Sequence, residues 1–153
     1  MHTNRREMLG HGAALLGLMA TAGLLPATAH AAWNKDAFAA KSMADVMKAM
    51  GGGAPAESAD VKIMGPDIAE NGAVVPVGCS CSLPGVKKLM ILVEKNPSVL
   101  AAAFNVTDGV EPSFNTRVKM GQSSNVYAVA LMNDGRVLYG VKAIKVTLGG
   151  CGG

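Results

Sequence analysis

The sequence predicts a mainly β fold, an immunoglobulin-like antiparallel β-sandwich with a short N-terminal helix and a flexible C-terminal arm. From residue 61 onward, apolar and polar residues alternate with a period of two, which is the spacing of a half-buried strand. Asn-Gly and Asp-Gly dipeptides at 71–72, 108–109 and 134–135 mark tight turns between these runs. The chain ends Leu-Gly-Gly-Cys-Gly-Gly, and glycines have no side chains to pack.

Residues 35–50 have the pattern of a helix. Four residues at i, i+3, i+4 and i+7 form one apolar face: Met43, Val46, Met47 and Met50. Ser42 and Asp45 resemble a capping box, but the Ala-rich stretch before them also permits a start nearer Asn34. We interpret the methionines as a packing face rather than a ligand site, because methionine commonly fills irregular apolar gaps. The Gly-rich residues 51–58 end the helix and could form a hinge.

Seven or eight short strands without intervening helices predict the sandwich. The expected strands are residues 61–64, 73–83, 88–94, 100–105, 114–120, 124–132, 136–140 and 141–148. In the last of these, Ile144, Val146 and Leu148 alternate with polar residues. Their burial in the core would anchor the glycine arm that follows.

The first 31 residues have the pattern of an export signal. Arg5-Arg6 precede an apolar stretch at 12–25, and Ala29-His30-Ala31 offers a cleavage site, with a second one ending at Ala29. The stretch is shorter than the roughly 20 residues that span a bilayer, so we expect no membrane association after its removal. The paired arginines indicate twin-arginine export to the periplasm.

We therefore expect four segments along the chain. They are a twin-arginine signal peptide at 1–31, a helix and Gly-rich hinge at 32–58, a β-sandwich at 59–148 and a Gly-Gly-Cys-Gly-Gly arm at 149–153. About 122 residues remain after the signal, which is the size of one domain with one core.

Removal of the signal also removes His2, His11 and His30, which are all the histidines of the chain. Imidazole is the usual general base, nucleophile activator, and metal or haem ligand. A self-sufficient hydrolase, haem protein or zinc enzyme is therefore not expected. The mature charge is nearly balanced and contains no basic block, which argues against nucleic-acid binding.

Cys79 and Cys81 alternate with small or polar residues and share one apolar face with Val75, Val77 and Leu83. A structural metal site needs about four ligands, and a disulfide between i and i+2 is disfavoured in an extended strand. We favour core packing for both thiols, with a redox or metal role as the alternative.

Cys151 lies on a glycine arm formed by Gly149, Gly150, Gly152 and Gly153. Fully extended, the three steps from Leu148 to Cys151 span roughly 10 Å. No histidine or arginine lies nearby in the sequence to stabilise a thiolate, so the thiol should react poorly alone. We expect a carrier and not an enzyme, with no cofactor of its own, whose thiol is activated inside a partner's cleft. A terminal cysteine that only forms dimers is the alternative.

Three segments together resemble the SoxY family, the carrier subunits of the bacterial Sox system for thiosulfate oxidation. They are Pro-Asp-Ile-Ala-Glu-Asn-Gly at 66–72, Val-Val-Pro-Val at 74–77 and Lys-Val-Thr-Leu-Gly-Gly-Cys-Gly-Gly at 145–153. The resemblance implies that Cys151 is the covalent attachment site for sulfur intermediates. It also implies a heterodimer with SoxZ and encounters with the c-type cytochrome SoxXA, the dimanganese hydrolase SoxB and, where present, the sulfane dehydrogenase SoxCD. The Cys79 and Cys81 pair is not part of that family pattern.

Two other functions remain open from the residues alone. The terminal Gly152-Gly153 would permit a ubiquitin-like carrier that holds sulfur as a C-terminal thiocarboxylate. The export signal and the strand pattern do not suit that class. A non-catalytic sandwich that serves only as an interaction module is the third interpretation.

Overall fold

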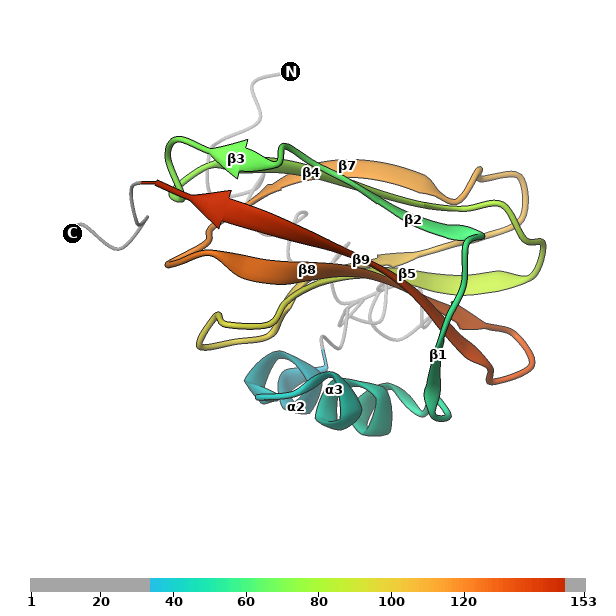
Figure 1. Ribbon diagram of the computed structural model, residues 1–153. Coiled ribbons are helices and arrows are strands. Elements are labelled where there is room, and N and C mark those ends of the chain that lie inside the picture. The colour runs from blue at the N-terminus through green and yellow to red at the C-terminus, as the bar shows by residue number, and fades with distance from the viewer. Residues whose placement is uncertain (1–33, 148–153) are drawn as a thin grey trace, which may run out of the picture. The chain divides into compact units, whose positions relative to one another are not determined.

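Two β-sheets face each other across an apolar core, and two short helices cover part of the outer face of the larger sheet (Figure 1). The computed structural model describes residues 34–147. The helices are α2 (Lys35–Ala39) and α3 (Met43–Met50). The strands are β1 (Pro55–Glu57), β2 (Val61–Met64), β3 (Ile68–Ala69), β4 (Val75–Cys81), β5 (Val86–Val93), β6 (Leu100–Asn105), β7 (Ser113–Val118), β8 (Ser124–Met132) and β9 (Val137–Val146). The predicted immunoglobulin-like β-sandwich is confirmed.

The larger sheet has the strand order β1-β9-β8-β5-β6, with β3 also paired to β9, and the smaller sheet has the order β2-β4-β7. The pairs β8–β9, β5–β8, β5–β6, β2–β4 and β4–β7 are antiparallel. Strands β1 and β3 both run parallel to β9 and share its other edge. Strand β8 pairs with β9 over residues 137–144, while β1 pairs with 137–139 and β3 with 145–146 on the other edge.

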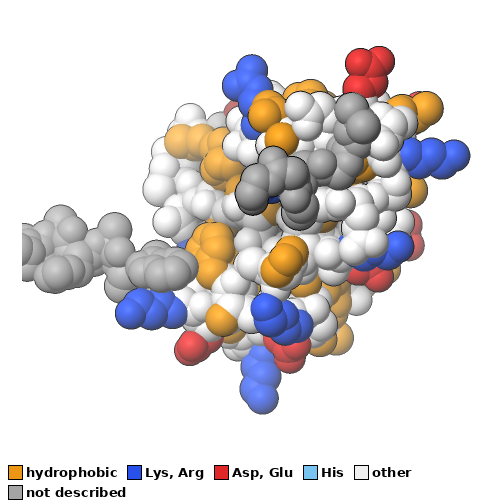
Figure 2. Space-filling model, turned by 90° about the vertical axis from the view of Figure 1, so that its left-hand side faces the viewer, with side chains coloured by type: hydrophobic (Ala, Val, Ile, Leu, Met, Phe, Trp, Pro, Cys, Tyr) orange, Lys and Arg blue, Asp and Glu red, His pale blue; other side chains and the backbone are white. Residues whose placement is uncertain are grey.

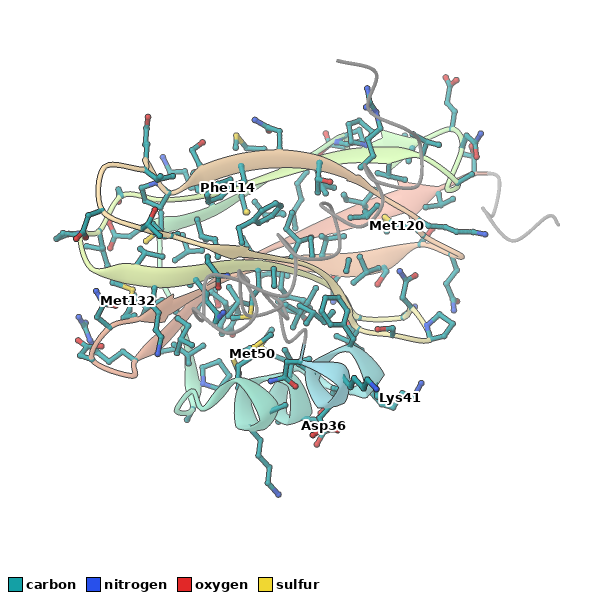
Figure 3. All side chains as sticks on the ribbon, turned by 180° about the vertical axis from the view of Figure 1, so that it is seen from behind. Asp36, Lys41, Met50, Phe114, Met120 and Met132 are labelled. Atoms are coloured by element: carbon teal, nitrogen blue, oxygen red, sulfur yellow. The ribbon has the colours of Figure 1, made fainter. Side chains whose placement is uncertain are left out.

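Apolar side chains form one cluster between the sheets and another beneath the helices. The inner cluster includes Val75, Leu89, Ile91, Met120, Val126 and Ile144, all at most 1 % exposed. The outer cluster joins Val46 and Met47 of α3 to Met90, Leu92, Val129 and Leu131 of the sheet. Met50 lies on the side of α3 that faces the sheet, whereas Phe114 and Met120 lie between the two sheets (Figure 3).

The single helix expected at 35–50 is divided into two, because Ala40 adopts an extended conformation. Each helix has its own N-cap: the Asn34 side chain accepts from the Ala37 N–H, and the Ser42 hydroxyl accepts from the Asp45 N–H. Both candidate starts in the sequence are therefore real. The packing function of the methionine face is confirmed, since all four of its residues belong to the outer cluster.

The structure differs from the sequence expectation in two connections. Residues 136–148 were expected to form two strands, but β9 is one continuous strand that passes through Gly140. Residues 51–58, interpreted as a possible hinge, contain β1 and are hydrogen-bonded to the scaffold. The Gly53 N–H donates to the Gly135 carbonyl at 3.2 Å, and the Ser58 N–H donates to the Tyr139 carbonyl at 2.9 Å. Among residues 34–147, no helix is long and apolar enough to cross a membrane.

At Gly140, β9 comes close to β2 of the smaller sheet. A Cβ atom at this residue would lie 2.1 Å from the carbonyl oxygen of Val61. We expect Gly140→Ala to lower the free energy of unfolding by about 2 to 3 kcal/mol, because the two sheets would have to separate. Urea unfolding followed by circular dichroism measures this change.

Gly53→Ala is the matched control, since its Cβ would meet no atom closer than 3.4 Å. Equal destabilisation by the two substitutions would contradict the steric explanation.

Candidate functional site at the base of the C-terminal arm

The predicted attachment residue Cys151 and its neighbours Gly149, Gly150, Gly152 and Gly153 lie outside the described residues. The structure instead defines the base from which this segment continues. Strand β9 runs along the larger sheet and ends at Val146, beside β3, and Thr147 is the last described residue (Figure 1). The anchoring expected for this strand is confirmed at Ile144, which is 1 % exposed in the inner core.

Strand β3 holds the end of β9 from one side. The Lys145 N–H donates to the Asp67 carbonyl at 2.9 Å, and the Thr147 N–H donates to the Ala69 carbonyl at 3.1 Å. The Thr147 hydroxyl also donates to the Glu70 carbonyl at 3.1 Å. The two bonds of Thr147 extend the contact with β3 and the residue after it to one residue beyond the end of β9.

Ser123, in the connection between β7 and β8, holds the same end from the other side. Its hydroxyl accepts from the Val146 N–H at 2.9 Å. The backbone at 145–147 is therefore bonded to two separate segments of the chain. We call these residues the arm base, because they fix the point on the scaffold from which the terminal segment starts.

An ion pair links β9 to the segment that leads into β3. The Lys142 ammonium lies 2.9 Å from the Asp67 carboxylate and donates to the Gly65 carbonyl at 2.6 Å. The hydrogen bond from Lys142, and then its charge, lower the pKa of Asp67 below the ordinary value. Because Asp67 is exposed, this pair contributes modestly to stability. It nevertheless favours the register that brings β3 to the arm base.

The thiols of Cys79 and Cys81 lie in β4 and face the inner core, at 0 % and 6 % exposure. Both are free. Burial raises the pKa of Cys79 to about 11, and the backbone of Phe114 only partly offsets this by hydrogen bonding. The core-packing interpretation is confirmed, and a buried thiol of this kind is a poor nucleophile. Among residues 34–147, no cluster of three or more His, Cys, Asp or Glu side chains is arranged to hold a metal ion.

A cavity of about 400 Å³ lies between the start of α3 and the outer face of the larger sheet. Its walls include Lys41, Glu94, Tyr127 and Tyr139, and the two tyrosine rings meet edge to face with centroids 5.8 Å apart. Burial, and then the charge of Glu94, raise the pKa of Tyr127. Sequence analysis missed this cavity, because it forms only where the helices meet strands far along the chain.

Sequence analysis also missed the contribution of β3 to the arm base. Two residues are too few to show a period, and the hydrogen-bonding partners of β3 lie almost 80 residues later in the chain. Apart from the turn signal of Asn-Gly at 71–72, the segment Pro-Asp-Ile-Ala-Glu-Asn-Gly at 66–72 stands out in the sequence only through a family resemblance. That resemblance was the one signal pointing to this strand.

Comparison with protein families gives a match to the family described as "Sulfur oxidation protein SoxY" over residues 46–151, a range that reaches Cys151. Among solved structures, the chain resembles the sulfur carrier protein SoxY from Chlorobium limicola f thiosulfatophilum. That match has 32 % identity and a TM-score of 0.63, and it covers 70 % of this chain and 97 % of that one.

Two variant superoxide reductases (neelaredoxins) from Ignicoccus hospitalis also match, each with a TM-score of 0.50. Their identities are 21 % and 19 %, with 56 % and 69 % of this chain covered and 78 % and 89 % of theirs. They share the fold alone with this chain. No curated protein sequence gives a match.

The burial of Cys79 and Cys81 predicts a selective labelling pattern. In the native protein at about pH 8, we expect iodoacetamide to modify Cys151 alone, because a pKa of about 11 leaves roughly one Cys79 thiol in a thousand ionised, and Cys81 is also buried. In concentrated guanidinium chloride all three cysteines should react. Peptide mass spectrometry identifies the labelled cysteines. The native Cys151→Ser variant is the control and should take up no label. Labelling of Cys79 or Cys81 in the native protein would contradict the prediction.

Proposed function

Because this chain belongs to the SoxY family of sulfur oxidation proteins, we propose that it is a covalent sulfur carrier that holds thiosulfate-derived intermediates on the Cys151 thiol. The observation that carries this proposal is the family match, which extends through the arm base to Cys151. The protein then acts as the substrate of its partner enzymes and performs no turnover alone. The mature sequence supports this division, since it lacks a histidine to act as a general base.

The first step joins thiosulfate to the arm. A bond forms between the Cys151 sulfur and the sulfane sulfur of thiosulfate, and the thiol proton passes to water. Two electrons leave, and the c-type haems of a cytochrome partner, proposed to be SoxXA, accept them. The product is a thiosulfonate on Cys151 that carries one negative charge.

The second step removes the sulfonate group by hydrolysis. The oxygen of water bonds to the sulfonate sulfur, the sulfur–sulfur bond to the sulfane sulfur breaks, and sulfate leaves. Cys151 keeps the sulfane sulfur as a persulfide, with no change in electron count overall. The dimanganese hydrolase SoxB is the proposed partner. Where SoxCD is present, the persulfide sulfur would lose six electrons and gain three water oxygens to regenerate a sulfonate.

The geometry of the arm base suits this relay. Hydrogen bonds from two segments hold the backbone at 145–147, so the carrier would present its cargo from a defined point on the scaffold. A covalent bond also prevents loss of a reactive persulfide between enzymes. We further propose export to the periplasm by the twin-arginine route and assembly with SoxZ before the relay begins.

The direct test replaces the attachment atom. We expect Cys151→Ser to abolish thiosulfate oxidation in a system reconstituted with the partner enzymes, because a hydroxyl cannot form the sulfur–sulfur bond. Circular dichroism should show an unchanged fold. Full activity of this variant would refute the carrier function.

Intact and peptide mass after thiosulfate turnover identify the attachment chemistry. Added sulfur on the Cys151 side chain supports the proposal, whereas replacement of a terminal oxygen by sulfur would indicate a thiocarboxylate at Gly153 instead.

A second substitution tests the dimensions of the arm. Gly150→Val adds a β-branched side chain next to the thiol, which stiffens and thickens the segment that has to enter a cleft. We expect turnover with the partner enzymes to fall about tenfold or more, while labelling of Cys151 by iodoacetamide stays within about twofold of the wild type. Equal losses in both assays would show that the substitution alters the thiol rather than its access to partners.

A further inference from the structure

An apolar strip extends along the outer face of β9 toward the arm base. Every second side chain of β9 points away from the inner core and lies on the outer face of the larger sheet. Ile68 of β3 lies on the same outer face, because it pairs in parallel with Lys145. Tyr127 of β8 lies opposite Val141. We call this surface the outer strip, and it consists of Tyr127, Tyr139, Val141, Ala143 and Ile68.

The helices leave most of the outer strip uncovered. They bury Met90, Leu92, Val129 and Leu131 of the central strands and, on β9, Val137 at its start. Further along, Val141 is 41 % exposed and Ile68 is 56 % exposed. Val141 and Ile68 are four register positions apart, and the exposed Ala143 lies between them on the same face. A row of exposed apolar side chains on a sheet face is typical of interaction sites.

The outer strip has a hollow at one end and the arm base at the other. Tyr127 and Tyr139 line the cavity of about 400 Å³ beside α3. At the other end, Lys145 lies two residues before Thr147, and Ile68 is the residue of β3 that pairs with Lys145. The end of the sandwich that carries β3 and the end of β9 shows apolar side chains among both basic and acidic side chains (Figure 2). A partner seated on the strip would therefore also meet charged side chains, with Lys145 on the outer face of β9 at that end.

The length of the arm limits where a partner enzyme can bind. Four residue steps separate Thr147 from Cys151, which is about 13 to 14 Å when fully extended. A thiol placed several ångströms inside a cleft leaves little of that length outside it. The mouth of the cleft must then touch the scaffold close to the arm base, where the outer strip ends.

We propose that the outer strip is the docking surface for the enzyme that receives the arm. This inference rests on the proposed carrier function. The complementary surface is the rim of an active-site cleft, with apolar side chains against Ile68 and Val141 and carboxylates near Lys145. Apolar burial supplies affinity, and the lysine charge speeds association at low ionic strength.

An enzyme fits this surface better than a second copy of the chain does. Two copies packed face to face through their outer strips would cover both arm bases and hinder delivery of either thiol. A cleft rim, by contrast, needs to surround one arm base and gains contact area from the adjoining strip. The relay also needs reversible contacts, and a strip of a few apolar residues is suited to a transient interface.

The test uses the full carrier complex and the cytochrome partner of the first step. In the double variant with Ile68→Thr and Val141→Thr, both side chains stay β-branched but become more polar. We expect the KM for the carrier to rise about tenfold with kcat unchanged, because docking weakens while the thiol and the chemistry are intact. Lys145→Glu should raise KM mainly at low salt.

Val110→Thr is the matched control. Val110 is 44 % exposed and lies in the connection between β6 and β7, at the opposite end of the sandwich from the arm base. We expect it to leave KM and kcat unchanged. Labelling of Cys151 should be the same in all variants.

Two results would overturn the docking surface. One is a KM for the double variant equal to that of Val110→Thr. The other is a change in the assembly state of the carrier, measured by light scattering, while KM stays unchanged, which would assign the strip to a subunit interface.

Cys151→Ser separates this inference from the carrier function. If that variant is inactive and the double variant is normal, only the docking surface is wrong, whereas an active Cys151→Ser variant removes both.

Discussion

The pairing of β9 on both of its edges is the constraint on which the rest of the structure depends. Antiparallel bonds to β8 place the strand in the larger sheet, and parallel bonds to β1 and β3 cover the two ends of the edge that would otherwise be open. Gly140 lets this strand approach the smaller sheet, and Ile144 anchors it in the inner core. These contacts fix the position of the arm base, so the packing of a strand sets the point on the scaffold from which the terminal segment starts.

Burial separates the chemistry of the three cysteines. Cys79 and Cys81 lie in the inner core, where burial of Cys79 raises its pKa and keeps its thiol protonated. Cys151 comes after the strand, on residues that have no side chains to bury. A carrier of reactive sulfur benefits from this separation, since a persulfide exchanges readily with any accessible thiol. Because Cys79 and Cys81 are buried, the bound sulfur cannot move from Cys151 to either of them.

The proposed relay divides its requirements between the carrier and its enzymes. The carrier contributes a thiol, a defined starting point for the arm and a surface near that point. The enzymes contribute the haem, metal and protein groups that oxidise or hydrolyse the bound sulfur. With an arm of about 14 Å, recognition cannot be far from delivery, and the outer strip beside β3 meets that condition. The proposed binding surface for the enzymes and the starting point of the arm then lie at the same end of the sandwich.

The sequence by itself determined the β-sandwich, the two candidate cap positions at Asn34 and Ser42, the burial of Cys79 and Cys81, and the candidate attachment residue Cys151. These features depend on local periods, turn dipeptides and composition, which are visible within a few residues. Only the tertiary structure decided that residues 35–50 form two helices, that residues 55–57 pair with β9, that β9 is continuous, and that β3 and Ser123 hold the arm base. Each of those contacts joins segments well separated along the chain, and short strands such as β3 have no period to reveal them. Long-range pairing is specified by the packing of the whole core, so it could not be read from any one segment.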